Sequence, residues 1–264
     1  MTKRIAVIDD RVLMSSFKLT RPEKVLLWLA ISEIRHKEKV LAETWYEVDI
    51  NDYATLEGLL DKSAYDMAKE VSESLPKKVF IVTKDKLTTT CQWVSKVQFD
   101  KEARSLKVKF SSTFIPYISE LSKRFNSLPL LESFSISSLY TWRLYDVFRT
   151  SDKQKKFKKV PRLALDLEEL YWILKVPKSY RVYKEFNRRV ITPMIEELEK
   201  LEIAKVEINV NKRKGRKVVG LTFHITWWPV VEELKGDDDI NKLLKEHGIE
   251  DCKLGSWVEW NEVA

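Results

Sequence analysis

The sequence predicts an α+β fold in which one order of helices and β-hairpins occurs twice. Stretches with apolar residues three or four positions apart, typical of amphipathic helices, alternate with stretches in which apolar residues recur at every second position. The order helix, strand, helix, helix and hairpin can be followed once in each half of the 264 residues. Such a repeat indicates two similar domains. We therefore expect one domain at residues 1–133, a second at 134–228 and an acidic extension at 229–264.

The first domain is expected to open with a short N-terminal extension and then a helix with a capping box. Thr20 and Glu23 have the spacing at which each side chain bonds to the other residue's backbone N–H. The elements expected after this helix are a short extended stretch at Trp45–Ile50, a helix at Asp52–Leu60, a helix from Asp61 through Leu75, and strands within Lys77–Thr90 and Cys91–Phe110.

The second domain repeats this order. The expected elements are a helix at Ser138–Thr150, a strand at Arg162–Asp166, a helix at Leu167–Lys175, a long helix from Ser179, and hairpin strands at Ile203–Val210 and Val218–Trp227 that turn at Gly215. Each half thus has the element order of a winged helix-turn-helix, which predicts tandem winged-helix domains with an additional acidic C-terminal segment. The join near Leu128–Ser138 is short and apolar, so we expect the domains to touch.

The helix from Ser179 is expected to have an apolar face and a basic face. The apolar stripe consists of Val182, Phe186, Val190, Met194 and Leu198. The other side carries the candidate base-reading residues Arg181, Lys184, Asn187, Arg188 and Arg189. Arginine and asparagine are the side chains that hydrogen-bond guanine and adenine edges in the major groove. Pro193 is expected to kink this helix or to end its base-reading part.

Further basic and polar residues indicate contacts to a DNA backbone. They are Lys178 and Ser179 before the helix, Lys212, Arg213, Lys214, Arg216 and Lys217 in the hairpin, and Lys62, Ser63, Tyr65 and Lys69 in the first domain. Acidic residues near the first-domain group lower its net positive charge. We therefore expect it to contribute less to sequence recognition than the second-domain group. The basic loop Lys153–Lys159 suits either another backbone contact or a disordered segment. A solvated surface helix is the alternative for the helix from Ser179, and Glu185 and Glu196 favour it.

The net charge of +7 conceals an asymmetry. Residues 229–264 contain ten Asp/Glu and four Lys/Arg, a net −6, so residues 1–228 carry the remaining +13. A basic body suits a polyanionic partner. The N-terminus lacks a signal-peptide core, and no apolar stretch is long enough to span a membrane, so we expect a cytoplasmic protein without membrane contact. Cys91 and Cys252 lie far apart, as expected for reduced thiols.

Catalytic and cofactor motifs are missing from the sequence. The six glycines cannot form a P-loop, which excludes an ATP-dependent helicase of that kind. A rolling-circle nicking enzyme needs paired histidines, whereas His36, His224 and His247 are solitary. No metal-ligand cluster is found either. We therefore expect a non-enzymatic protein without metal or cofactor, whose nine tryptophans mostly pack in the core.

Several motifs, taken in order, resemble a known family. They are Phe114-Ile-Pro-Tyr117 with Arg124-Phe125, Ser138-Leu-Tyr-Thr-Trp-Arg-Leu-Tyr145, Tyr183-Lys-Glu-Phe-Asn-Arg-Arg-Val-Ile191, and Lys214-Gly-Arg-Lys217 running into Phe223. Over roughly Phe17–Thr226 the chain is similar to the iteron-binding initiator (Rep) proteins of theta-replicating plasmids, which have two winged-helix domains. The acidic segment after Trp228 extends beyond the usual family core.

The resemblance implies a mechanism. Family members bind repeated sites (iterons) in duplex DNA at a plasmid origin as monomers, using both domains. They help to open a neighbouring A·T-rich region and recruit host replication initiator and helicase-loading proteins. Many also dimerise through the first domain and repress their own gene. By position, the helix and hairpin of the second domain match the family's base-reading helix and wing, and the helix near Ser63–Lys69 matches its weaker DNA contact.

Two other functions remain open on the residues alone. One is a sequence-specific transcriptional repressor that shares the tandem winged-helix fold. The other is a scaffold whose basic face binds RNA or acidic protein.

Overall fold

The structure is a computed structural model that describes residues 4–35, 39–57, 61–84, 87–121, 125–151, 161–214 and 217–228. The chain divides into two compact units, Met1–Thr226 and Trp227–Ala264. Several expectations lie outside the described residues: the loop Lys153–Lys159, the turn at Gly215, Arg216, the segment 229–264, and the side chains of Lys62, Lys212, Arg213 and Lys214.

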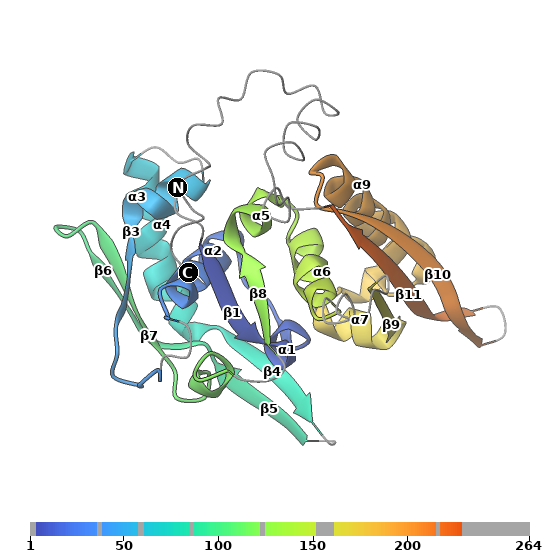
Figure 1. Cartoon of the computed structure of the whole chain (residues 1–264), viewed down its shortest axis with the longest axis horizontal. Coiled ribbons are helices and arrows are strands. Elements are labelled where there is room, and N and C mark those ends of the chain that lie inside the picture. Colours follow the sequence, from blue (N-terminus) through green and yellow to red (C-terminus); the bar gives the residue numbers. More distant parts are fainter. Residues whose placement is uncertain are drawn as a thin grey trace, which may run out of the picture. The chain divides into compact units, whose positions relative to one another are not determined.

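The first half of the larger unit contains three small antiparallel sheets and five helices in the described residues (Figure 1). The elements are β1 (Ile5–Asp9), α1 (Asp10–Leu13), β2 (Ser16–Phe17), α2 (Arg21–Ser32), β3 (Tyr46–Asp49), α3 (Ile50–Glu57), α4 (Asp61–Ser74), β4 (Val79–Lys84), β5 (Leu87–Gln92), β6 (Val94–Asp100), β7 (Ser105–Phe110), β8 (Phe125–Pro129) and α5 (Leu130–Ser135). The sheet orders are β1-β8, β2-β4-β5 and β3-β7-β6.

The capping box at the start of α2 is confirmed. Glu23 accepts a hydrogen bond from the Thr20 backbone N–H at 2.8 Å, and the Thr20 hydroxyl accepts one from the Glu23 N–H at 3.4 Å. Behind this cap, α2 is buried from Glu23 to Ile31. Its Trp28 lies 6.1 Å from the ring of Trp93, which in turn lies 4.4 Å from Phe80. These tryptophans are therefore core residues, as expected.

The N-terminus is not a simple extension, and here the sequence-based expectation was wrong. Strand β1 pairs antiparallel with β8, and the register runs from Ile5 opposite Pro129 to Asp9 opposite Phe125. Ala6 and Ile8 are fully buried. The strand was missed because its apolar run is short and its pairing partner lies more than 100 residues away along the chain.

The second half follows the predicted order. Its elements are α6 (Leu139–Arg149), β9 (Arg162–Asp166), α7 (Leu167–Ile173), α8 (Tyr183–Phe186), α9 (Thr192–Lys200), β10 (Ala204–Lys214) and β11 (Lys217–Trp227), and the sheet order is β10-β11-β9. The expected apolar side of α6 includes one exception. Leu139 is 42 % exposed because it occupies the first position of the helix, ahead of the buried turns.

A carboxylate joins two helices of this half. Glu197, on α9, accepts hydrogen bonds from the backbone N–H groups of Ser137 and Ser138, at 2.7 and 3.1 Å, directly before α6. Burial would raise the pKa of Glu197, but the hydrogen bonds from Ser137 and Ser138 lower it below its ordinary value. The ionised carboxylate thus satisfies N–H groups at the start of α6, which otherwise have no partner within the helix.

The two halves touch, as expected from their short join. The Ser16 hydroxyl, in β2, donates a hydrogen bond to the carbonyl oxygen of Trp172, in α7. The Arg143 guanidinium, on α6, donates to the carbonyl oxygen of Ser15 at 2.6 Å. The Lys24 ammonium, on α2, contacts the Asp146 carboxylate of α6 at 2.6 Å. These contacts, of which the last two are buried, join the first-half strands and helices to α6 and α7.

Candidate nucleic-acid interface

The basic helix begins later than the sequence suggested. Lys178–Tyr180 form a single 3₁₀ turn, and the helix starts at Tyr183, with Val182 in an extended conformation at the N-cap. The turn is closed by backbone hydrogen bonds from Tyr180 to Pro177 and from Arg181 to Lys178. Val182 therefore does not join the apolar stripe and is 63 % exposed, whereas Phe186, Val190, Met194 and Leu198 are buried.

Pro193 neither ends this helix nor leaves it regular. Residues Asn187–Ile191 form a π-helical turn, and α9 continues from there to Lys200. Proline has no N–H, and its ring would clash with the carbonyl four residues earlier in a regular α-helix. The wider turn avoids this conflict, since the Thr192 N–H bonds to the Asn187 carbonyl. The Asn187 side-chain amide also lies 3.3 Å from the Thr192 hydroxyl.

Four of the candidate base-reading residues lie on this helix, and Arg181 lies directly before it, after the 3₁₀ turn. Arg181, Lys184, Arg188 and Arg189 are exposed, and Asn187 is half-buried. Two of them are already oriented by contacts within the chain. Arg181 donates a hydrogen bond to the Val176 carbonyl at 3.0 Å, and the Arg189 guanidinium lies 4.8 Å from the centre of the Tyr180 ring.

Glu185 connects two of these arginines, a contact that the sequence spacing alone allows but does not establish. One of its carboxylate oxygens accepts from Arg188 at 2.7 Å and from Arg189 at 2.9 Å. These hydrogen bonds lower the pKa of Glu185 to about 2. The carboxylate is therefore ionised at neutral pH and orients both guanidinium groups. It also offsets part of their positive charge.

The basic hairpin lies beside this helix in the same half. Lys212, Arg213 and Lys214 end β10, and Lys217, which is exposed, begins β11 (Figure 1). Strand β11 also pairs with β9 through Gly220–His224, so β11 is the central strand of a three-stranded sheet and β10 is an edge strand. The cluster of basic residues thus falls at the tip of the hairpin, the position of a wing.

The remaining candidate backbone contacts fall at two places. Lys178 and Ser179 are exposed in the 3₁₀ turn before the basic helix, and Ser63 and Lys69 are exposed on α4. Tyr65 is half-buried: its ring lies 6.0 Å from that of Phe99 and 5.3 Å from the Arg104 guanidinium. Tyr65 therefore packs α4 against the β6–β7 hairpin.

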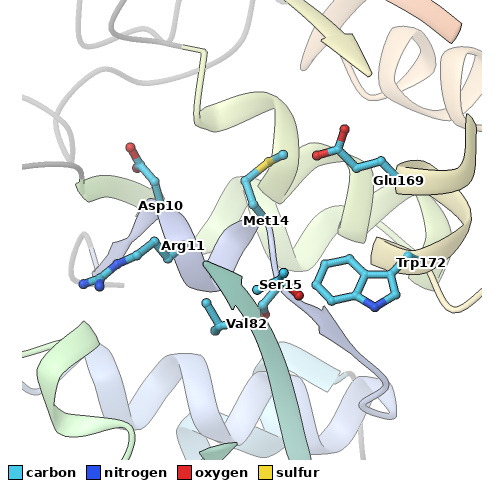
Figure 2. A pocket seen from close by; sticks show the side chains of 8 residues that line it. Asp10, Arg11, Met14, Ser15, Val82, Glu169 and Trp172 are labelled. Carbon is cyan, nitrogen blue, oxygen red and sulfur yellow. The ribbon is translucent and has the colours of Figure 1, made fainter. Parts of the chain in front are cut away.

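A separate cavity of about 650 Å³ lies between α1, β4 and α7 (Figure 2). It is lined by Asp10, Arg11, Met14, Ser15, Val82, Thr83, Glu169 and Trp172. Internal contacts engage several of these groups. The Arg11 guanidinium pairs with Asp9 at 2.8 Å, and the Ser15 hydroxyl donates to the Val12 carbonyl at 2.7 Å. Burial raises the pKa of Glu169, and nearby Asp166 raises it further.

The described residues contain no group of three His, Cys, Asp or Glu side chains that could hold a metal ion. His224 lies on β11, with its ring 3.2 Å from the Asn209 side-chain amide across the hairpin. No helix in the described ranges has the length and apolar character needed to cross a membrane.

Each half contains helices that are followed along the chain by a β-hairpin, and this arrangement defines a protein of the tandem winged-helix class. The chain matches the family model described as "Initiator Replication protein, WH1" over residues 7–149 and the one described as "Initiator Rep protein, WH2" over residues 166–225. It therefore belongs to the family of initiator replication proteins.

Curated relatives and a solved structure agree with this assignment. A "Replication initiation protein" of Escherichia coli is 22% identical over 234 residues, which cover 85% of this chain and 70% of the relative. The "PI protein" of Escherichia coli is 24% identical over 258 residues, 84% of this chain and 82% of the relative. The crystal structure of the Pi initiator protein in complex with iteron DNA matches with a TM-score of 0.72 at 23% identity, covering 86% of this chain and 98% of that one. The predicted fold of two winged-helix domains is confirmed.

Proposed function

We propose that this chain initiates plasmid replication by binding iterons in duplex DNA at the origin. Family membership supports this function, and the related Pi initiator was crystallised with iteron DNA. The observation that carries the proposal is the set of exposed arginines, Arg181, Arg188 and Arg189, before and within the basic helix, in the same half as a hairpin with a basic tip. A helix of this kind suits a major groove, and the hairpin suits the adjacent phosphates.

Within this proposal the residues have two roles. Arg181, Lys184, Asn187, Arg188 and Arg189 read base edges. The backbone is contacted by Lys178, Ser179, Lys212, Arg213, Lys214, Arg216 and Lys217, and by Lys62, Ser63, Tyr65 and Lys69 of the first winged-helix domain. The half-buried packing of Tyr65 supports a smaller contribution from that domain than from the second.

The protein acts by binding and not by catalysis. Binding of iterons would help to open the origin and would bring host replication initiator and helicase-loading proteins to it in the cytoplasm. A second copy of the chain is a further partner, and a dimer would repress the protein's own gene. The net charge of +13 on residues 1–228 supports a polyanionic partner, because cations on the protein displace counterions from DNA.

An origin-transformation assay separates an initiator from a repressor with the same fold. A plasmid that lacks its own initiator and carries the DNA flanking this gene should replicate only when the protein is supplied. A repressor would bind the same DNA, lower transcription from it and give no transformants.

Glu185→Gln should raise affinity for random duplex DNA by up to about fivefold, because it removes one negative charge from the basic surface. The preference for iterons over random DNA should fall, because the carboxylate no longer orients Arg188 and Arg189. Filter binding on both duplexes measures the two affinities. Glu196→Gln, an exposed carboxylate on the same helix, is the control. If both variants changed the two affinities equally, the contacts of Glu185 with Arg188 and Arg189 would have no role in the preference for iterons.

Lys217→Ala should weaken binding to every sequence alike. It should also reduce the slope of log affinity against log salt by about 0.9, as expected for the loss of one phosphate contact. Binding titrations between low and moderate salt give this slope. Lys205, also exposed but near the opposite end of the hairpin, provides the matched control, Lys205→Ala. If the tip of the wing contacts phosphates, the salt slope should change in Lys217→Ala and stay at the wild-type value in Lys205→Ala.

A further inference from the structure

Val182 is an exposed apolar residue in a strongly polar setting. It is 63 % exposed, more than Phe186, Val190 and the other members of the apolar stripe, which are buried. Its sequence neighbours Arg181 and Lys184 are exposed cations. Packing therefore does not account for a valine at this position.

The structure also fixes the backbone at this residue. Val182 is the N-cap of α8, and its carbonyl accepts the first backbone hydrogen bond of the helix, from Phe186 at 2.9 Å. The 3₁₀ turn at Lys178–Tyr180 precedes the residue in the chain, so Val182 lies between two regular backbone elements. A β-branched side chain also has restricted rotation about χ1, so little side-chain entropy is lost when its methyl groups make a contact. Val182 therefore presents a preorganised apolar surface at the helix start.

The start of a helix in the major groove is the part whose side chains reach the base edges. The exposed apolar group in that groove is the C5-methyl of thymine, which apolar side chains contact. We propose that Val182 recognises one thymine of each iteron through this methyl group. The inference rests on the proposed function, since it names a specificity-determining residue of the same interface.

The test compares thymine with deoxyuridine, which lacks only the C5-methyl group. The probe is a duplex with one repeat that the protein protects in a footprint of the DNA flanking its gene, and each thymine is replaced in turn. Wild-type protein should lose about fourfold in affinity at one position, the value of burying one methyl group. Val182→Ala should lose a similar factor in affinity for the unmodified duplex. Its affinity should not fall further when deoxyuridine replaces thymine at the sensitive position.

Two controls separate this contact from a general defect. Leu139→Ala removes another exposed apolar side chain, outside the basic helix, and should keep the full sensitivity to deoxyuridine. The urea midpoint of Val182→Ala should equal that of the wild type, because the side chain is mostly exposed. The inference is overturned if no thymine is sensitive, or if Val182→Ala retains the wild-type loss. If wild-type protein does not prefer the repeat to random DNA, the proposed function itself fails.

Discussion

Replacing Arg188 with alanine is expected to lower the affinity for iteron DNA by roughly five- to 150-fold, about 1–3 kcal/mol, as for the loss of a bidentate base contact. Binding to random duplex DNA should change little. The guanidinium is exposed, and its contact with Glu185 at 2.7 Å orients it before DNA arrives. Less side-chain entropy is therefore lost on binding, and the geometry favours one base over the others.

Competition titrations with iteron and random duplexes at one salt concentration measure this effect. Lys200→Ala, an exposed cation in the last turn of α9, controls for the loss of one positive charge. Glu185 keeps its contact with Arg189 in the Arg188 variant, so the helix should stay folded. Equal losses on both duplexes would mean that Arg188 contacts the backbone and reads no base.

Replacing Asp146 with alanine should lower the free energy of unfolding by about 3–5 kcal/mol, the cost of leaving a buried charge unpaired. Asp146 is fully buried, and it faces the Lys24 ammonium at 2.6 Å and the Arg143 guanidinium at 3.8 Å. Burial raises the pKa of Asp146, although the charges of Lys24 and Arg143 and the hydrogen bond from Lys24 act in the opposite direction. Without the carboxylate, the buried Arg143 guanidinium would lose its counter-charge, and the pKa of Lys24 would fall further.

Urea denaturation with linear extrapolation gives the loss of stability. Lys24→Met is the matched comparison, because it keeps a long side chain and leaves Asp146 paired with Arg143. Lys24→Met should lower the free energy of unfolding clearly less than Asp146→Ala does. Equal losses would show that the contact between Lys24 and Asp146, and not the balance of the whole cluster, stabilises this region.

Stability should also rise with pH above neutrality, because burial lowers the pKa of Lys24 to about 7 from its ordinary value of 10.5. Between these values the unfolded chain holds a proton that the folded chain has lost. Stability therefore increases with pH through this window, by up to about 1.4 kcal/mol per pH unit. Urea midpoints at pH 7, 8 and 9 measure the slope. In Lys24→Met this part of the slope should be missing, and an unchanged slope would contradict the assignment to Lys24.

Elements with a local signal were predicted well from the sequence. The capping box at Thr20 and Glu23 marks the start of α2, and alternation of apolar residues marks the two hairpin strands after Ile203. Both patterns depend on residues close together in the chain. By contrast, β1 has no such signal, since its pairing with β8 depends on residues more than 100 positions away.

The basic surface was located from sequence, but its detailed geometry was not. The four-residue spacing placed Val182 in the apolar stripe, and only the 3₁₀ turn before it makes that residue exposed. Pro193 did signal an irregularity, but local sequence does not distinguish a kink from a π-helical turn. The positions of Glu185, Arg188 and Arg189 permit ion pairs at three and four residues apart. Whether they form depends on competing contacts such as that of Arg189 with Tyr180.

A footprint of the purified protein on the DNA flanking its own gene tests the proposed function most directly. An initiator that reads iterons through the helix at Tyr183–Lys200 predicts several protected repeats of one sequence, regularly spaced and in the same orientation. Arg188→Ala should lose all of them together, while Lys200→Ala should keep them. A single protected palindrome, or no protection beyond that seen on random DNA, would contradict the proposed function.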